Sequence, residues 1–470
     1  MAQERFTKAA LLQTLPPQES GELHPAITEK IRASGRKVIV LDDDPTGTQT
    51  VHGVPVLTVW SIESLCTELG DDLPAVYLLT NTRSVPLAEA QAINTEIGRN
   101  LSMASRLTGR DFVVVSRSDS TLRGHFPGEM SALEAALERE ELVWLIIPCF
   151  FEGGRYTIGD IHYVEEDGLL VPAAETAFAQ DKVFGYRSSN LPQWVEEKTN
   201  GRISSGNVVS ISIDLIRAGG PERVTEHLCK LHPGQVCVVN AASYRDLEVF
   251  VLGLLSAEAQ GRSFLYRTAA SFVRVRAGIV PRPLLTKQEL DIGGPGSGLI
   301  VIGSFVPRTT SQLEALLENP SIQAVEVKVD ALLDPGRRLA EIERAASRVN
   351  DGIKSGLDVA AYTSRELVAQ GNHQENMQIG QTISSGLVAI VRKLEARPRY
   401  LVAKGGITSS DIATQALGIR KAMVLGQILP GVPVWQPGVE SAYPGMPYIV
   451  FPGNVGDDHA LIQIIKNLKD

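Results

Sequence analysis

Residues 37–50 read Lys-Val-Ile-Val-Leu-Asp-Asp-Asp-Pro-Thr-Gly-Thr-Gln-Thr, an apolar run that ends in three adjacent carboxylates and a turn. A run that is apolar on both faces is typical of a buried strand in a parallel sheet. Ligands of open α/β sheets bind just beyond the carboxyl ends of such strands. The run therefore places Asp42, Asp43 and Asp44 where a substrate or a metal would be held. The alternative is a solvated turn at the end of a strand.

Strand-like runs alternate with helix-compatible stretches along most of the chain. In the first part, strands are predicted over 38–41, 75–79, 112–115 and 142–147, and helices over 88–107 and 127–138. After a Gly/Pro-rich break at 291–298, strands are predicted over 299–302, 400–403 and 423–425, and helices over 311–317, 339–350 and 411–417. This alternation predicts an α/β fold built around mostly parallel sheets.

The length of 470 residues exceeds what one ordinary hydrophobic core supports, so two domains are expected. The break predicts a boundary between about residues 275 and 298. We therefore expect an N-terminal extension over 1–36, a first domain over 37–285 and a second domain over 299–470. Each domain is predicted to be a mostly parallel sheet flanked by helices, with the active site in the cleft between the domains.

The composition is that of a globular protein, with 43% hydrophobic and 21% charged residues and a net charge of −9. It favours no nucleic-acid partner. The apolar stretch 142–151 is too short to span a bilayer, and the first residues lack the pattern of a signal peptide. The four cysteines show no C-x-x-C spacing and are typical of reduced thiols. We therefore expect a cytoplasmic protein without a membrane partner.

A second polar segment, Ser-Arg-Ser-Asp-Ser-Thr-Leu-Arg-Gly at 116–124, follows the predicted strand 112–115. Arg117 and Arg123 offer forked donors for a carboxylate or a phosphate, and Asp119 can accept a proton or a hydroxyl hydrogen bond. Arg83 also follows a strand and would reach the same crevice if the strands are neighbours. This combination is typical of a site for a polyhydroxy acid. The alternative is a capped helix start with surface arginines.

A third segment, residues 403–411, runs from a strand through Gly405 and Gly406 into a helix. Paired glycines let backbone N–H groups approach an anion closely, which suits a nucleotide phosphate. Thr408 and Asp411 fit a capping pattern at the start of the helix. The spacing of a Walker A loop is absent, and a plain strand–helix turn explains the glycines equally well. Residues 303–312 and 451–456 could complete such a pocket.

Other catalytic signatures are missing from the sequence. It contains no H-E-x-x-H pair, no G-x-S-x-G elbow and no G-x-G-x-x-G fingerprint after a strand. A zinc site, a serine hydrolase and a dinucleotide-binding dehydrogenase are therefore not expected.

Taken together, these motifs resemble the four-carbon acid sugar kinase family. Its D-D-x-T-G opening is matched at 43–47, its T-R pair at Thr82-Arg83, and its K-x-D-S-T-L-R-G motif at 117–124, where Arg117 replaces the lysine. Its G-S-x-S-x-x-T-x-x-Q, G-G-D-T-S and K-S-G-N-F-G motifs are similar to 303–312, 405–409 and 451–456. The resemblance extends from about residue 37 to 465, in the order of the family.

The resemblance implies ATP-dependent phosphorylation of the terminal hydroxyl of a sugar acid such as threonate, erythronate or a 3-oxo-tetronate. ATP and Mg2+ are the expected cofactors, and assembly into a homodimer is left open. The residues that it implies for the substrate are Asp43, Arg83, Arg117, Ser118, Asp119, Ser120 and Arg123. Those that it implies for ATP are Ser304, Thr309, Gly405, Gly406, Ile407, Thr408 and Gly453.

Three positions on the nucleotide side depart from the family pattern. Val306 stands for a serine, Ile407 for the aspartate of G-G-D-T, and Phe451 for the late lysine. The alternative function that these departures suggest is a non-catalytic protein that binds a sugar acid and has lost the use of ATP.

We call the group formed by Asp42–Asp44, Arg83 and residues 116–124 the acid site, and the roles expected of its residues follow from their charges. Arg83 and Arg117 are expected to bind the carboxylate of the substrate. Asp119 has arginines on both sides in sequence and is expected to stay ionised and to position the substrate. Repulsion between Asp43 and Asp44 would raise the proton affinity of one of them, so either is expected to act as the base. The alternative is that no base is needed.

Overall fold

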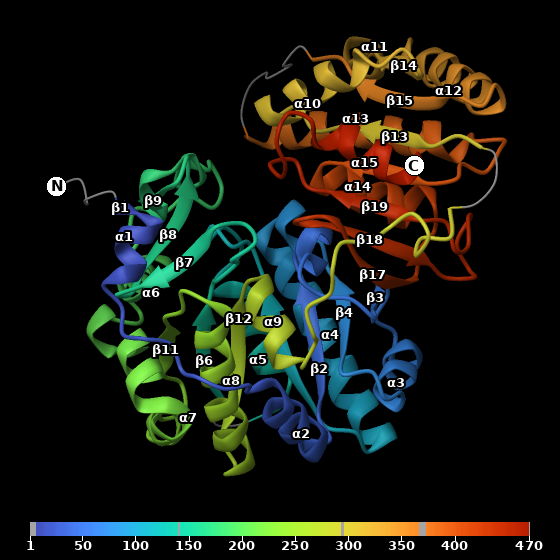
Figure 1. Ribbon diagram of the computed structural model, residues 1–470. Helices are drawn as coiled ribbons and strands as arrows, with labels where there is room; N and C mark the ends of the chain where they lie inside the picture. Colours follow the sequence, from blue (N-terminus) through green and yellow to red (C-terminus); the bar gives the residue numbers. More distant parts are fainter. Residues whose placement is uncertain (1–5, 140–141, 293–295, 366–372, 470) are drawn as a thin grey trace. The chain divides into compact units, whose positions relative to one another are not determined.

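The computed structural model describes residues 6–139, 142–292, 296–365 and 373–469 (Figure 1). The chain divides into two compact units. The first unit comprises Met1–Val51 and Val59–Pro281, and the second comprises His52–Thr58 and Arg282–Asp470. The predicted break at 291–298 is partly outside the described residues, because 293–295 are not described.

The main sheet of the first unit is parallel throughout, with the strand order β10-β11-β6-β12-β5-β2-β4. All four strands predicted for this part of the chain are present. The bounds are β2 (Lys37–Asp42), β4 (Ala75–Leu79), β5 (Phe112–Arg117), β6 (Leu142–Ile147), β10 (Val209–Ile211), β11 (Val236–Val239) and β12 (Ser263–Thr268). Every residue of β2, β4, β5 and β6 is buried, as expected for strands covered on both faces.

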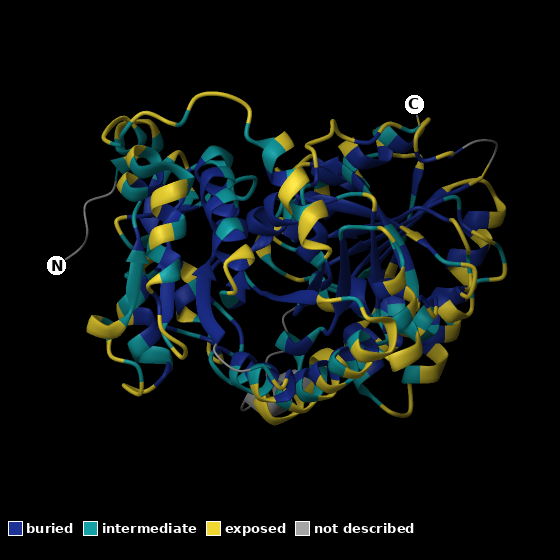
Figure 2. Cartoon of the chain, turned by 90° about the horizontal axis from the view of Figure 1, so that it is seen from below, coloured by how far each residue is buried: buried dark blue, intermediate teal, exposed yellow. Residues whose placement is uncertain are grey.

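Helices in two groups flank this sheet. The helices α3 (Ile62–Gly70), α4 (Leu87–Thr108) and α5 (Gly128–Ala136) pack in one group, and α2 (His24–Ser34), α7 (Ile213–Cys229), α8 (Tyr244–Ala259) and α9 (Ala270–Arg276) pack in the other. In Figure 2 the exposed residues lie on the outer faces of helices and in loops, while the strands between them are buried. The helices predicted over 88–107 and 127–138 correspond to α4 and α5.

The N-terminal segment is part of the first unit. Strand β1 (Phe6–Thr7) joins a small antiparallel sheet of order β1-β9-β8-β7, followed by α1 (Lys8–Gln13). The other strands of this sheet are β7 (Arg155–Ile158), β8 (Ile161–Glu166) and β9 (Leu169–Pro172). Helix α2 packs on α8, and Ile27 is its buried residue. The small sheet is followed by the 3-10 turns η3 (Ala173–Glu175) and η4 (Ala177–Gln180) and by α6 (Leu191–Lys198).

The sheet of the second unit has the order β3-β17-β18-β19-β16-β13-β15-β14. Its strands are β3 (Val54–Leu57), β13 (Leu299–Ile302), β14 (Ile322–Val327), β15 (Asp358–Thr363), β16 (Leu401–Lys404), β17 (Lys421–Leu429), β18 (Val432–Pro437) and β19 (Tyr448–Phe451). The strands from β19 to β14 are parallel, whereas β3, β17 and β18 are antiparallel. Strand β3 comes from the N-terminal part of the chain, and Gly53 N donates to Val424 O at 2.7 Å beside it.

The helices of the second unit are α10 (Pro307–Leu317), α11 (Val329–Leu333), α12 (Arg338–Lys354), α13 (His373–Arg392), α14 (Gly406–Asp411) and α15 (Ala460–Lys469). Among the described residues, no helix of either unit combines the length and the apolar character that a membrane crossing requires.

The helix predicted over 411–417 begins earlier than expected. Helix α14 starts at Gly406, because Gly405 (φ +118°) turns the chain there, and a π-helical turn over Ile412–Ala416 follows. The prediction that Thr408 caps the helix is wrong, since Thr408 lies inside it. The Asp411 carboxylate instead accepts hydrogen bonds from Ser384 Oγ and Gln415 Nε2.

Candidate functional site

The acidic segment after β2 lies between two arginine-bearing loops of the first unit. Because β2 pairs with β4 on one side and β5 on the other, the residues that follow these strands meet at one edge of the sheet. Arg83 Nη1 lies 3.9 Å from Asp43 Oδ1 and 3.4 Å from Asp119 Oδ1. The strand order therefore brings together the three groups of residues that the sequence singled out.

Asp42 forms a buried ion pair with Arg117, whose Nη1 donates to Asp42 Oδ1 at 3.1 Å. Burial raises the pKa of Asp42 to about 7, although the positive charge of Arg117 acts in the opposite direction. Loss of solvation outweighs the attraction of the partner, because an ionised carboxylate is costly in a medium of low polarity.

Asp44 is both a turn residue and an ion-pair partner. Its Oδ1 accepts from Thr46 N at 2.8 Å, which caps the 3-10 turn Pro45–Thr48, and its Oδ2 accepts from Arg83 Nη2. Burial acts to raise the pKa of Asp44, but Arg83 and the hydrogen bonds from Thr46 hold it below the usual value. A turn and a charged site were the two alternatives for this segment, and Asp44 takes part in both, since it caps the turn and pairs with Arg83.

Asp43 differs from its neighbours in having an open acceptor. Its Oδ2 accepts from Ser118 Oγ, whereas its buried Oδ1 has no hydrogen-bond partner within the described residues. Arg83 Nη1 at 3.9 Å and Arg117 Nη1 at 4.0 Å are near Oδ1 without donating to it. Burial raises the pKa of Asp43, against the pull of Arg83. A buried acceptor without a donor is a position that a ligand hydroxyl can complete.

Asp119 is held as a carboxylate. Its Oδ2 accepts from Arg123 Nε at 2.7 Å and from Thr121 Oγ1, and Arg83 lies beside its Oδ1. Burial would raise the pKa of Asp119, but Arg123 and then Arg83 keep it far below the usual value. The neighbouring Ser120 is buried, and its carbonyl oxygen is 2.8 Å from His162 Nε2.

Two buried charged residues of this network were missed by the sequence analysis. Arg267 on β12 donates to Ser118 Oγ at 2.6 Å and to Glu129 Oε2 at 2.9 Å. Glu129, on α5, also accepts from Thr82 Oγ1. A charged residue near the end of the apolar stretch 263–268 was a detectable signal for Arg267. No such signal in the sequence marked Glu129, because its partners come from distant segments. A small cavity of about 20 Å³ is lined in part by Ser118, Asp119, Arg123 and Arg267.

Three loops of the second unit meet at the carboxyl ends of β13, β16 and β19. Strand β16 pairs with both β13 and β19, so the segments after these strands are neighbours. Thr309 Oγ1, on α10, donates to Gly453 O at 3.0 Å and lies 3.2 Å from Ser304 Oγ. Gly405 N donates to Phe451 O at 2.8 Å. The predicted residues of the nucleotide side are therefore brought together.

Glycines allow the three loops to approach one another closely. A Cβ atom on Gly405 would lie 3.0 Å from Ser304 Cβ, and one on Gly453 would lie 3.1 Å from Ser304 Oγ. A Cβ on Gly303 would lie 2.2 Å from Thr408 Oγ1. A side chain at Gly303 would clash outright, the φ of +118° at Gly405 favours glycine, and a side chain at Gly453 would require Ser304 to move. Ile407, at the tip of the turn, is 54% exposed.

Lys404 is a buried lysine beneath these loops. Its Nζ donates to Pro452 O at 2.6 Å and lies 3.5 Å from the centre of the Phe451 ring. Burial, together with the charge of Arg308, lowers the pKa of Lys404 to about 6. Lys404 is the register partner of Phe451 across the β16–β19 pair. A lysine is therefore present beside the position where the family motif has one.

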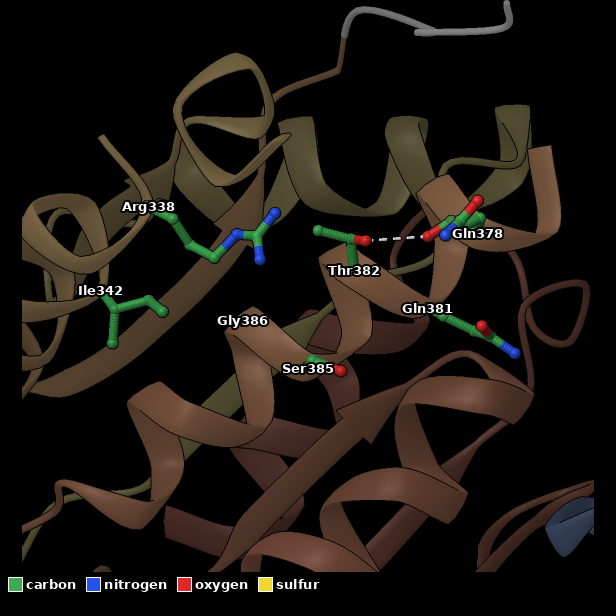
Figure 3. Close-up of a pocket in the computed structure, with 7 residues that line it drawn as sticks. All are labelled: Arg338, Ile342, Gln378, Gln381, Thr382, Ser385 and Gly386. Carbon is green, nitrogen blue, oxygen red and sulfur yellow. Dashed lines mark hydrogen bonds between the residues drawn. The ribbon is translucent and has the colours of Figure 1, made fainter. Parts of the chain in front are cut away.

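A larger pocket lies elsewhere in the second unit (Figure 3). It has a volume of about 280 Å³ and lies between α12 and α13. The Arg338 side chain extends toward Thr382, whose Oγ1 donates to Gln378 O at 2.9 Å. The lining residues are Arg338, Ile342, Gln378, Gln381, Thr382, Ser385 and Gly386. None of the residues predicted for either site contributes to it.

Two family models match the chain: a sugar-binding N-terminal domain over residues 38–276 and a nucleotide-binding C-terminal domain over 299–461. The chain belongs to the four-carbon acid sugar kinase family. This membership confirms the resemblance inferred from the motifs.

Proteins similar to this family member are known as kinases of four-carbon acids. A D-erythronate kinase from Heliobacterium modesticaldum is 24% identical over 445 residues, which cover 90% of this chain and 95% of that kinase. A 3-oxo-tetronate kinase from Pseudomonas savastanoi pv. phaseolicola is 27% identical over 407 residues, which cover 83% and 88% of the two chains. Such relatives support a sugar-acid kinase.

Solved structures share the fold. A protein from Salmonella typhimurium LT2 superposes with a TM-score of 0.64 at 18% identity, over 91% of this chain and 98% of that chain. A protein from Haemophilus influenzae superposes with a TM-score of 0.60 at 19% identity, over 92% and 100%. The predicted two-domain α/β architecture of mostly parallel sheets is confirmed by this agreement.

The burial of Lys404 leads to a prediction about pH. With a pKa of about 6 in the folded chain and about 10.4 when unfolded, this lysine binds fewer protons in the folded state between these values. The free energy of unfolding should therefore rise with pH from about 6 to about 10, by at most about 1.4 kcal/mol per pH unit from this group.

Lys404→Met should flatten that rise, and its stability should exceed that of the wild type most clearly near pH 6.5. Hydrogen-exchange protection of β13, β16 and β19 across this pH range measures the effect. Lys466→Met, which removes an exposed lysine from the same unit, is the matched control. Identical pH slopes for the two variants would contradict the prediction.

Proposed function

We propose that this protein transfers the γ-phosphoryl group of ATP to the terminal hydroxyl of a four-carbon sugar acid of the erythronate, threonate or 3-oxo-tetronate type. Family membership and the kinases among its relatives support this reaction. The observation on which the proposal chiefly rests is the open Oδ1 of Asp43, buried between Arg83 and Arg117. It is a carboxylate oxygen that can accept the proton of a substrate hydroxyl.

Asp43 is the base in this proposal. The hydroxyl donates its hydrogen bond to Asp43, and its oxygen attacks the γ-phosphorus. The bond from that phosphorus to the bridging oxygen of ADP breaks, and the hydroxyl proton passes to Asp43. A pKa raised by burial makes Asp43 a stronger proton acceptor than Asp44 or Asp119, whose pKa values are lowered by arginines. Asp44 and Asp119 instead fix the position of Arg83.

The nucleotide is assigned to the loops after β13, β16 and β19. The close approach of Gly405, Gly453 and Ser304 supports a cradle without bulky side chains, in which phosphate oxygens can come near the backbone. Thr309 holds two of these loops together. The other residues assigned to the nucleotide are Gly406, Ile407 and Thr408.

Mg2+ is the cation proposed to accompany the nucleotide. The described residues contain no group of three or more His, Cys, Asp or Glu side chains placed to hold a metal ion. Mg2+ in phosphoryl-transfer sites is commonly bound through one or two carboxylates together with phosphate oxygens and waters. In this proposal the cation enters with ATP, and the phosphate oxygens and waters supply most of its ligands. Bound there, it would neutralise phosphate charge.

The first test of the function is turnover. With ATP and Mg2+, the protein should form ADP in the presence of at least one acid among erythronate, threonate and their 3-oxo forms. Substrate-dependent ADP release and the phosphorylated product are both measured. Binding of an acid without turnover of any member of the panel would support the non-catalytic alternative instead.

The second test separates the base from the positioning carboxylate. Asp43→Asn should lower kcat by about 100-fold or more with little change in KM, because it removes proton acceptance but keeps the shape. Asp119→Asn should raise KM as well, since it loosens Arg83 and Arg123. If Asp119→Asn alone shows the pure loss of kcat, the assignment of the base is reversed.

The third test concerns the cradle. In Gly453→Val, the new side chain would start 3.1 Å from Ser304 Oγ and 3.6 Å from Val306 Cγ2 and would fill the space between the loops. ATP should bind at least about tenfold more weakly, while acid binding in the first unit should persist in calorimetry. Gly380→Ala is the control, because its Cβ would meet nothing within 4 Å. Unchanged ATP affinity in folded Gly453→Val would place the nucleotide elsewhere.

A further inference from the structure

Most arginines of the acid site already have carboxylate partners within the chain. Arg83 and Arg117 pair with the acidic segment after β2, and Arg123 pairs with Asp119 and Asp181. Arg267 pairs with Glu129. A substrate carboxylate that binds one of these arginines must compete with a buried partner, and breaking such a pair is costly.

Arg155 is the exception among the arginines near this site. It is the first residue of β7, and its backbone exchanges hydrogen bonds of 2.8 and 3.2 Å with Phe150. Among the described residues, no carboxylate lies within ion-pair distance of its guanidinium, and its Nε is buried without a hydrogen-bond partner. Burial lowers the pKa of Arg155, with the charge of Asp119 acting against it. Arg155 is half-buried overall, so an anion that reaches its guanidinium would complete a cation that has lost part of its solvation.

Two contacts place Arg155 at the acid site. Both Arg155 and Arg123 lie near the ring of Phe178. Their guanidinium carbons are 5.7 Å and 5.1 Å, respectively, from the centre of the ring. Arg123 in turn holds Asp119. Arg155 therefore lies near the same aromatic ring as Arg123, the arginine that contacts the positioning carboxylate.

A histidine links β7 to the loop after β5. Thr157 Oγ1 lies 3.0 Å from His162 Nδ1, and His162 Nε2 lies 2.8 Å from Ser120 O. Burial lowers the pKa of His162 to about 4, so this imidazole is neutral, and it donates from Nε2 and accepts at Nδ1. Because side chains alternate along a strand, Arg155 projects from the same face of β7 as Thr157. The strand is thus fixed with Arg155 on the side of the 116–124 loop.

We infer that Arg155 binds the carboxylate of the sugar-acid substrate, through the two N–H groups of its guanidinium fork. This inference rests on the proposed function and changes one of its details. Arg83 and Arg117, which were expected to hold that carboxylate, instead donate to Asp44 and Asp42, the neighbours of Asp43 in the acidic segment. Arg155 then distinguishes an acid from an uncharged polyol.

The test compares an acid with its uncharged amide, which keeps the same hydroxyl groups. In the variant Arg155→Met, kcat/KM for the acid should fall by about 10- to 100-fold, as expected for the loss of a charge-assisted hydrogen-bond pair. The value for the amide should stay within about threefold of wild type. Arg155→Lys should recover part of the acid activity. Because the guanidinium has no carboxylate partner in the chain, neither variant should lower the thermal stability.

Two controls separate charge recognition from structural effects. Arg123→Met removes a partner of Asp119 and should impair the acid and the amide alike. Arg187→Met, which changes an arginine whose side chain is 90% exposed, should impair neither. An equal loss on both substrates in Arg155→Met, or no loss at all, would overturn the assignment.

Failure of the proposed function is a distinct result. If the wild type phosphorylates no tetronate, calorimetric binding of the acid and the amide replaces turnover. Selective loss of acid binding in Arg155→Met would then support the assignment without the kinase reaction. If the wild type shows no preference of the acid over the amide, the assignment is wrong whatever the reaction.

Discussion

Three consecutive carboxylates at the end of β2, two of them buried and one half-buried, are the constraint on which the acid site depends. Such a segment is tolerated because its neighbours in the sheet supply two arginines, Arg83 from the turn after β4 and Arg117 from the last position of β5. Removal of either arginine would leave a buried charge uncompensated, at a cost of about 3–5 kcal/mol. The order β5-β2-β4 therefore matters for the charges of this segment, because it places both arginines beside the three carboxylates.

Features that depend on local sequence could be predicted, and features that depend on distant pairing could not. The strand of residues 38–41 and the polar turn after it are encoded by adjacent residues, so their placement at a sheet edge followed directly. Glu129 is buried through contacts with Thr82 and Arg267, which lie 47 and 138 residues away. The inclusion of β3 in the second unit depends on pairing with β17, for which a four-residue apolar strand gives no local signal.

On the nucleotide side, a residue type that this chain lacks at one motif position occurs at the neighbouring position of the sheet. Phe451 stands where the family motif has a lysine, yet its register partner on β16 is Lys404, whose Nζ lies over the Phe451 ring. A sequence motif compares residues at one position of a single strand. A binding site depends on all side chains that lie close together, including those from the neighbouring strand. The absence of the lysine at 451 is therefore weaker evidence for loss of nucleotide binding than the sequence alone suggests.

Charge balance is a further argument for an arginine beyond the ion pairs of the acid site. The network joins six carboxylates, Asp42, Asp43, Asp44, Asp119, Glu129 and Asp181, to four arginines. If all were ionised, this surplus of negative charge would repel an anionic substrate. Burial raises the pKa of Asp42 to about 7, so protonation near neutral pH reduces the surplus. Arg155 reduces it further without giving up an internal partner, whereas Arg83 and Arg117 could bind the substrate only by releasing carboxylates.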